Sequence, residues 1–152
     1  MRTIPYISAV MAAAILAAAL ATGCGSSGRK SDDALKATII RVIEAAWNEG
    51  DIDALDELYA RDFVRRRPPF DDYTGLDVHK ERVKLIRGAY PDHKTIIHDI
   101  IVDGDMAAVR YTWTGTHTGT GLPLPPTGKR VSVEGCDVYR FVNGKIAEEW
   151  AH

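Results

Sequence analysis

The sequence predicts an α+β fold in which three N-terminal helices pack against a strongly curved antiparallel sheet of four or more strands. Apolar residues recur at three- and four-residue spacing before Pro91 and alternate after it, so a helical period gives way to a strand period. Asn143-Gly144 joins two alternating runs, and this dipeptide favours a tight hairpin because both positions tolerate a positive φ. Since a twisted sheet can curl around helices, we expect a cone-shaped barrel with a partly free inner face.

The helices are predicted over residues 31–48, 52–59 and 76–89. Asp51 is expected to cap the second helix. An irregular stretch follows this helix and is closed off by Pro68-Pro69. The apolar stripe of the first helix consists of Leu35, Ile39, Val42, Ile43, Ala46 and Trp47.

Four strands are predicted in two hairpins, 94–102 with 105–116 and 131–142 with 145–150. With the Asn-Gly turn fixed at two residues, the register places Tyr139 opposite Glu148 and Asp137 opposite Trp150. The inner face of the second hairpin then carries Val131, Val133, Gly135, Asp137, Tyr139, Phe141, Ile146, Glu148 and Trp150. From the first hairpin, this face is expected to receive Ile96, His98, Ile100, Ala107, Val109, Tyr111, Trp113 and His117.

Two carboxylates, Asp137 and Glu148, therefore interrupt an otherwise apolar and aromatic face. Burial disfavours the charged form of a carboxylate, so its pKa rises toward a value useful for proton transfer. Abstraction of a proton next to a carbonyl needs such a base and a donor for the developing enolate oxygen. The alternative is a structural role, in which neighbouring groups hydrogen-bond both acids. The two interpretations stay open for Asp137, and the structural one is favoured for Glu148.

The predicted catalytic residues are Asp137 and His117. His117 is included because it ends a strand beside a glycine-rich loop, where ligands often enter. His79 and His93 are expected to be solvated, and metal binding is not expected because the histidines lack metal-ligand spacing. The residues expected to line a ligand site are Tyr111, Trp113, Tyr139, Glu148 and Trp150.

Composition points to one soluble globular domain. The chain has 152 residues, of which 45% are hydrophobic and 26% charged, with a formal net charge of −2. A nucleic-acid-binding surface normally needs a basic excess, so nucleic acid is not expected as a partner.

The N-terminus resembles a bacterial lipoprotein signal. Arg2 precedes a long uncharged run, and this run ends at Cys24, which a Gly/Ser stretch follows. We therefore expect a signal peptide over 1–23, lipidation of Cys24, a flexible linker to residue 30 and a folded domain over 31–152. Leu20 lies one position further from the cysteine than is usual, and an uncleaved membrane anchor is the alternative. The expected location is the extracytoplasmic side of the bacterial cell membrane.

Several motifs resemble the SnoaL-like polyketide or ester cyclase branch of the ketosteroid-isomerase-like and nuclear-transport-factor-like proteins. They are Trp47 to Asp51, Leu55 to Tyr59, Gly115 to Gly119, Pro125 to Lys129, Tyr139 to Phe141 and Gly144 to Trp150. The resemblance covers residues 35–150 and implies the cone fold. It also implies ring closure by an aldol-type reaction with a carboxylate as general acid and base, no metal or organic cofactor, and pairing into homodimers through the outer face of the sheet.

One residue departs from this resemblance. The cyclases have an acid/base Asp a few residues after the Trp that corresponds to Trp150, whereas this sequence continues only as Ala151-His152. Asp137 is therefore expected either to replace that Asp or to belong to a site that only binds. The prediction is an exported domain that binds a small apolar molecule, with a cofactor-independent cyclase or isomerase activity left open. The alternative is a non-catalytic ligand-binding or dimerisation lipoprotein.

Overall fold

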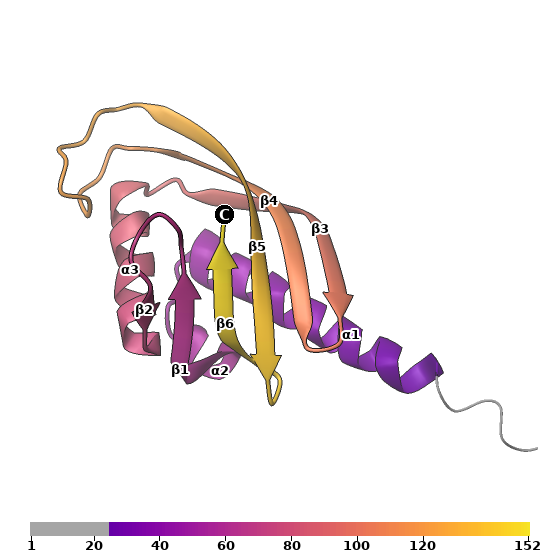
Figure 1. Cartoon of the computed structure of the whole chain (residues 1–152). Helices are drawn as coiled ribbons and strands as arrows, with labels where there is room; N and C mark the ends of the chain where they lie inside the picture. Colours follow the sequence, from indigo (N-terminus) through magenta and orange to yellow (C-terminus); the bar gives the residue numbers. More distant parts are fainter. Residues whose placement is uncertain (1–24) are drawn as a thin grey trace, which may run out of the picture.

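The computed structural model describes residues 25–152 (Figure 1). The predicted signal peptide and Cys24 lie outside the described residues. The helices are α1 (Gly25–Arg41), a π-helix that continues it, η1 (Val42–Glu49), the short α2 (Leu55–Leu58) and α3 (Leu76–Ala89). The strands are β1 (Tyr59–Arg66), β2 (Tyr73–Thr74), β3 (Lys94–Asp103), β4 (Met106–Thr116), β5 (Arg130–Val142) and β6 (Lys145–Ala151).

The strands form one mixed sheet in the order β2-β1-β6-β5-β4-β3. All neighbours are antiparallel except β1 and β6, which run parallel. Figure 1 shows β4 and β5 extending past β6 and bending toward α3, so the sheet curves around the helices. The α+β class and the curved sheet are therefore confirmed, and the sheet has six strands.

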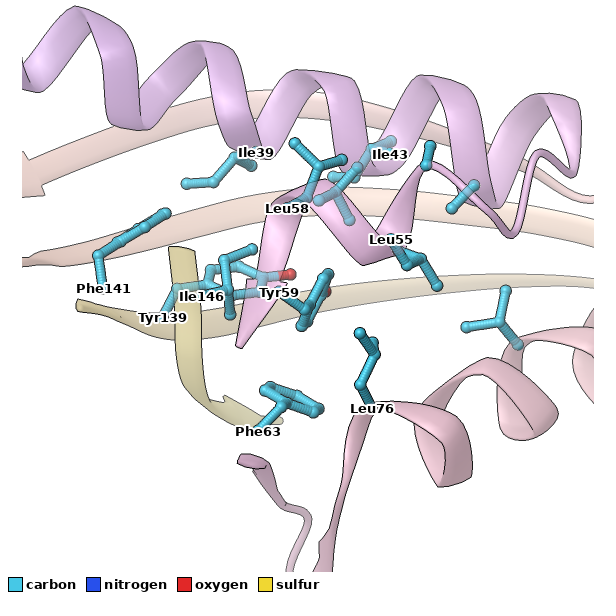
Figure 2. Packing of buried hydrophobic residues seen from close by; sticks show 14 of the residues in the cluster. Ile39, Ile43, Leu55, Leu58, Tyr59, Phe63, Leu76, Tyr139, Phe141 and Ile146 are labelled. Atoms are coloured by element: carbon cyan, nitrogen blue, oxygen red, sulfur yellow. The ribbon is translucent and has the colours of Figure 1, made fainter. Parts of the chain in front are cut away.

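The core lies between the helices and the concave face of the sheet (Figure 2). Ile39 and Ile43 enter it from α1 and η1, and Phe141 and Ile146 enter it from the last hairpin. Full burial of a large apolar side chain contributes about 1.5–3 kcal/mol, so the helices are bound to the sheet mainly by this contact. Other buried members are Val42, Ala46, Leu55, Leu58, Tyr59, Phe63, Leu76, Val83, Val109 and Tyr139.

The first helix begins earlier than expected, at Gly25, so residues 25–30 are helical where a flexible linker was predicted. Ser31 does not cap this helix, because its hydroxyl donates a hydrogen bond back to the carbonyl of Gly28 at 3.0 Å. The helix continues through η1 to Glu49, one residue beyond the predicted end, and Gly50 follows with a φ of +86°. This left-handed cap is a conformation that glycine adopts at little cost.

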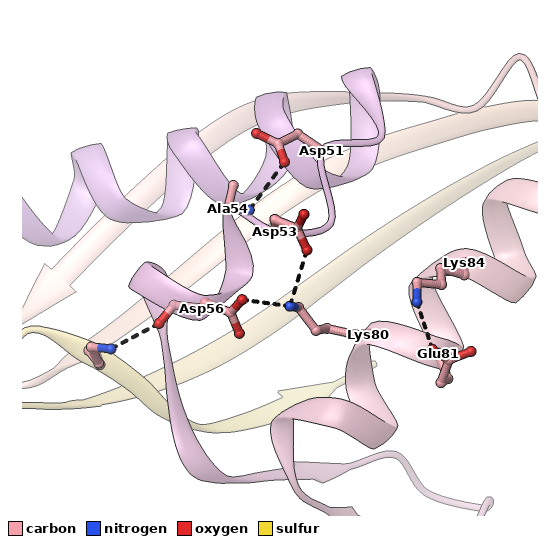
Figure 3. A network of polar contacts seen from close by, with 8 residues as sticks. Asp51, Asp53, Ala54, Asp56, Lys80, Glu81 and Lys84 are labelled. Carbon is pink, nitrogen blue, oxygen red and sulfur yellow. Dashed lines mark hydrogen bonds and ion pairs between the residues drawn. The ribbon is translucent and has the colours of Figure 1, made fainter.

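Polar contacts fix α2 against α3 and β6 (Figure 3). Asp51 accepts a hydrogen bond from the backbone N–H of Ala54 at 3.3 Å in the turn before α2. The N-cap position of α2 is Ala54 and carries no side-chain cap, so the predicted capping of the helix by Asp51 is wrong. Lys80 Nζ of α3 lies 2.7 Å from Asp56 Oδ2 and 3.5 Å from Asp53 Oδ1. Lys145 Nζ donates to the carbonyl of Asp56 at 3.0 Å, so α2 is attached to elements on both sides.

Strand β1 was not predicted, because residues 52–59 were expected to be helical and an irregular stretch was expected to follow. Helix α2 is only one turn long, and the chain becomes a strand at Tyr59. The partner of β1 is β6, and this parallel pair sets Arg65 opposite Glu149. Pairing over such a sequence separation leaves no local signature, since tertiary packing and not propensity decides it.

The hairpin β3–β4 contains a bulge. Ile97 pairs with Tyr111 and Asp99 pairs with Arg110, so His98 is an extra residue on β3. Because one extra residue reverses the face of all residues beyond it, Ile96 and His98 point outward and are exposed. The prediction that these two side chains line the inner face is wrong, whereas Ile100, on the turn side of the bulge, is partly buried against the core.

Candidate functional site

The last hairpin, β5–β6, has the predicted turn and an unpredicted bulge. Asn143 and Gly144 have φ values of +52° and +75°, as the Asn-Gly signal requires. Phe141 pairs with Ile146, but Arg140 pairs with Glu148, so Ala147 is the extra residue on β6. The expected pairs of Tyr139 with Glu148 and of Asp137 with Trp150 are therefore wrong by one residue.

This shift exchanges the two faces of β6 beyond Ala147. Tyr139 pairs with Glu149 and Val138 pairs with Trp150. Glu149 consequently takes the inward position predicted for Glu148, while Glu148 and Trp150 lie on the outer face. The predicted inward placement of Glu148 and Trp150 is wrong, and the inward acid of β6 is Glu149.

Asp137 and Glu149 form a buried carboxyl pair at the concave face, with 4% and 2% of their surfaces exposed. They lie on the adjacent strands β5 and β6 as diagonal neighbours and share a side-chain hydrogen bond. The backbone N–H of His152 also donates to Asp137 Oδ1 at 3.3 Å. The predicted inward position of Asp137 is thus confirmed.

Arg65 is the cation that contacts this carboxyl pair. Its Nη2 lies 3.1 Å from Glu149 Oε1, across the parallel β1–β6 contact. It also hydrogen-bonds the hydroxyl of Tyr73 on β2. That hydroxyl lies 2.7 Å from Nδ1 of His79 on α3, so a polar chain runs from the carboxyl pair through β1 and β2 to a helix.

Tyr111 and Tyr139 provide the hydroxyl groups near the pair. Tyr111 Oη donates to Asp137 and lies 3.2 Å from each carboxylate oxygen. Gly135, opposite Tyr111 in the β4–β5 ladder, makes this approach possible, since a Cβ there would lie 2.6 Å from Tyr111 Oη. Tyr139 is buried and pairs with Glu149. The predicted inward placement of both tyrosines is correct.

The carboxyl pair holds one proton near neutral pH. Burial raises the pKa of Glu149 to about 8 and raises that of Asp137 as well, and Arg65 opposes both shifts. Two carboxylates side by side resist double ionisation, so the proton belongs to the pair. Glu149 Oε2 is buried and accepts no hydrogen bond from an N–H or O–H group of the protein, which is the environment expected for the protonated oxygen.

The outer face of β6 presents the opposite electrostatics. Glu148 Oε1 accepts from Arg66 Nε at 2.7 Å, and Oε2 accepts from Arg140 Nε at 3.0 Å. The hydrogen bond from Arg140, together with that from Arg66, lowers the pKa of Glu148. Because the side chains of Arg66 and Arg140 are 42% and 44% exposed, the low exposure of Glu148 reflects cover by a surface ion network, not entry into the core.

His117 and Trp113 belong to a second, separate cluster. Trp113 packs edge-on against Tyr90 at 5.3 Å and stacks on His93 at 5.2 Å, and His117 packs against Tyr90 at 5.3 Å between ring centroids. His117 Nδ1 lies 3.3 Å from Thr127 Oγ1. The His117 side chain is buried.

The structure does not bring His117 and Asp137 together. Asp137 pairs with Val109, and His117 follows the end of β4 at Thr116. At roughly 3.3 Å per strand residue, the eight positions from Val109 to His117 correspond to about 26 Å along the chain. The two predicted catalytic residues therefore lie in separate clusters of side chains.

Two further histidine expectations are wrong. His79 and His93 were expected to be solvated, yet they are 0% and 6% exposed. Burial lowers the pKa of His79 to about 3 and that of His93 to about 4, so both are neutral at physiological pH. His79 pairs with Tyr73, and His93 Nε2 lies 2.9 Å from Thr95 Oγ1.

Sequence reasoning missed Glu149, Arg65, Tyr73 and His79. Arg65 belongs to the triplet Arg65-Arg66-Arg67, in which the sequence does not distinguish the inward residue from the outward one.

Across residues 25–152, no group of three or more His, Cys, Asp or Glu side chains is placed to hold a metal ion. The same part of the chain has no helix that is both long and apolar enough to cross a bilayer.

Comparison with known proteins identifies the family. No curated protein sequence matches the chain. Among solved structures, AclR of Streptomyces galilaeus, for which hydroxylase activity is proposed, is 30% identical with a TM-score of 0.67, over 78% of this chain and 73% of its own. IdmH of Streptomyces antibioticus, for which polyketide cyclase activity is proposed, is 28% identical with a TM-score of 0.67, over 78% of this chain and 90% of its own.

A protein of Jannaschia sp. CCS1, proposed to be a SnoaL-like polyketide cyclase, shares the fold with a TM-score of 0.73 at 20% identity, over 79% of this chain and 85% of its own. The profile of the SnoaL-like polyketide cyclases matches residues 37–152, which include every strand and the whole carboxyl pair with its neighbours. The chain belongs to the SnoaL-like polyketide cyclase family.

Proposed function

We propose that this protein is a cofactor-independent cyclase or isomerase that acts on a small, neutral carbonyl compound, with Asp137 as the general base. The observation that carries the proposal is the buried Asp137–Glu149 pair on the concave face of the sheet. A carboxylate inside a protein is a strong enough base near pH 7 to remove a proton next to a carbonyl group. The membership of the chain in a cyclase family supports this class of reaction.

The proposed step moves one proton. The Asp137 carboxylate takes a proton from the carbon next to the carbonyl, and the electron pair of the broken C–H bond forms an enolate. The enolate carbon then attacks a second carbonyl carbon to close a ring, and the alkoxide that forms takes the proton back from Asp137. In an isomerisation, the enolate instead takes that proton back from Asp137 at another carbon. Tyr111 donates a hydrogen bond to Asp137, and we assign its hydroxyl as the donor to the enolate oxygen.

Charge balance supports a neutral substrate. With the carboxyl pair singly protonated, its one negative charge is balanced by Arg65, and the neutral His79 adds no charge. A substrate carboxylate or phosphate would bring an uncompensated charge next to Asp137, which is costly in a buried site. We therefore assign an uncharged ketone or ester as the substrate class.

The reaction proposed for the relatives varies. IdmH and AclR share this fold with proposed cyclase and hydroxylase activities, respectively. A common fold therefore leaves the reaction open, and the assignment rests on the site residues of this chain.

Exchange of the carbon-bound protons of a simple ketone for deuterium, followed by ¹H NMR, tests the proposal. The wild type should accelerate exchange, and Asp137→Asn should reduce the rate by about 10²-fold or more. Glu148→Gln is the matched control, since it changes a carboxylate on the outer face of the next strand and should keep the wild-type rate. Equal rates for the wild type and Asp137→Asn would remove Asp137 from the mechanism.

We also propose that the protein is exported and held at the membrane through a lipid on Cys24. The support is the sequence alone, namely the uncharged run before Cys24 and the glycines and serines after it. Metabolic labelling with a fatty-acid probe should mark the wild type and not Cys24→Ala, and the variant should leave the membrane fraction. An unlabelled, soluble wild type would contradict the proposal.

Pairing into homodimers also stays a prediction, which light scattering of the folded domain can test.

A further inference from the structure

We propose that Arg65 is a positioning residue that acts through Glu149 to keep Asp137 available as a base, and that Tyr73 and His79 hold Arg65 in place. This inference deepens the proposed function and rests on it for its consequence in catalysis. The contacts that support it all lie within residues 25–152 and do not depend on a bound substrate.

Because of the strand register, Arg65 acts on the base Asp137 through Glu149. Arg65 lies opposite Glu149 in the parallel β1–β6 ladder, and the guanidinium bonds Glu149 Oε1 at 3.1 Å. The other oxygen, Glu149 Oε2, is buried without an N–H or O–H donor from the protein, and we assign to it the hydrogen bond that Glu149 shares with Asp137. Glu149 therefore faces a cation on one oxygen and the base on the other, so its proton is directed toward Asp137.

Tyr73 and His79 orient the guanidinium from the opposite side. The Tyr73 hydroxyl accepts a hydrogen bond from Arg65 and lies 2.7 Å from Nδ1 of His79. Since His79 is fully buried and neutral, Nδ1 can accept the tyrosine proton, and the hydroxyl is then committed to both neighbours. The side chain of Arg65 is only 14% exposed, which leaves it little freedom to rotate away.

The charges around the carboxyl pair show why this cation matters. The titratable groups that face it are Arg65 and Tyr59 from β1, Tyr73 from β2, Tyr111 from β4 and Tyr139 from β5, and His79 of α3 contacts Tyr73 behind them. Exposed Arg67, just past the end of β1, adds a weaker attraction. Arg65 is the buried cation among them, and the other five groups are neutral near pH 7. Without it, burial alone acts on the pair, so both carboxyls bind protons more tightly and the base is neutralised near pH 7.

The test is a pH titration of the Asp137 and Glu149 side-chain carboxyl carbons by ¹³C NMR, in the folded domain without substrate. Arg65→Gln should move the titration of the pair upward by about one pH unit or more, because a cation that stabilised the charged form is gone. Arg65→Lys keeps the charge and should restore most of the wild-type titration. The matched control is Arg66→Gln, which removes the neighbouring arginine on the outer face and should leave the pair unchanged.

The ketone exchange assay then connects the titration to function. The acidic limb of the pH–rate profile should move upward in Arg65→Gln by the same amount as the titration, with the rate recovering at higher pH. Tyr73→Phe removes one support of Arg65 and is a second test if Arg65→Gln does not fold. It should give an upward shift smaller than one pH unit.

Two results would overturn the inference: identical carboxyl titrations in folded Arg65→Gln and Arg66→Gln, or no shift in folded Tyr73→Phe. Failure of the proposed function looks different. In that case the titration shifts as expected while neither the wild type nor any variant exchanges ketone protons.

Discussion

Glu148 and Glu149 are adjacent in the sequence and on the same strand, yet they have opposite chemistry. Glu149 is buried beside Asp137, and burial raises its pKa to about 8. Glu148 lies between Arg140 and Arg66 at the surface, and their hydrogen bonds lower its pKa. The arginines follow the same division, because Arg65 pairs inward with Glu149 while Arg66 pairs outward with Glu148.

The difference shows that the face of the sheet, and not the residue type, decides what a glutamate does here. One extra residue, Ala147, determines which of the two acids turns inward. On the outer face a carboxylate contacts partly exposed arginines that are open to water. On the inner face it finds one fixed cation and a second carboxyl, so a proton is retained at neutral pH.

The strongest test of this comparison is truncation of each acid. Glu149→Ala should lower the free energy of unfolding by about 3 kcal/mol, since it leaves Arg65 without its buried partner. Glu148→Ala should cost no more than about 1 kcal/mol, because exposed ion pairs contribute little. Urea denaturation of both variants measures the difference. Equal losses would show that the two faces are not energetically distinct.

A second test perturbs the inner face without touching an acid. Gly135→Ala places a methyl group where the Tyr111 ring lies, so the tyrosine must move away from Asp137. We expect ketone proton exchange to fall about tenfold, as in Tyr111→Phe, since one hydrogen bond to a charged group is lost in both. An unchanged rate in Tyr111→Phe would remove this hydroxyl from the mechanism.

The pH dependence of stability should also separate the two glutamates. Glu149 binds its proton more tightly in the folded state, so its contribution to the free energy of unfolding falls as pH rises toward about 8. The buried His79 and His93 act in the opposite direction, and their effect fades only about one pH unit above their unfolded pKa near 6.5. From about pH 7.5 the carboxyl effect dominates, at up to about 1 kcal/mol per pH unit.

Urea denaturation from pH 7.5 to 8.5 measures this slope. The wild type and Glu148→Gln should lose stability over the range, whereas Glu149→Gln should be nearly flat because the titrating group is gone. A slope that persists in Glu149→Gln would assign the proton to another group.

The smallest effect is expected at Trp150. This side chain was predicted to line a ligand site but lies on the outer face opposite Val138. Trp150→Phe should therefore leave the exchange rate within about twofold of wild type, since surface substitutions rarely perturb a distant site. A larger loss would mean that the outer face takes part in the reaction.

The sequence predicts those features that depend on neighbouring residues. The third helix was predicted over residues 76–89, and α3 has these bounds. The Asn143-Gly144 turn forms as its φ preferences require, and β5 turns Asp137 and Tyr139 inward as its alternation indicates. In each case the information lies within a few residues of the element itself.

The errors have one physical origin, which is that tertiary packing chose between locally equivalent conformations. The sequence does not predict the bulges at His98 and Ala147. Each bulge exchanges the inner and outer positions of the strand residues beyond it, and at Ala147 it therefore turns Glu149 inward in place of Glu148. Strand β1 and the inward turn of Arg65 depend on β6, which follows much later in the chain. Half of the candidate site, Asp137 and Tyr111, was thus predictable, and the other half, Glu149 and Arg65, was not.

The parallel pairing of β1 with β6 has a consequence for how the protein is made. Because β6 inserts between β1 and β5, the centre of the sheet is completed by a segment synthesised about 80 residues after β1. Until then, Arg65 has no carboxylate to meet and the edges of β1 and β5 are open to other chains. Assembly of the proton-carrying pair and closure of the sheet are therefore one late folding event, and a nascent chain that stalls before β6 is an aggregation-prone intermediate with no chemistry.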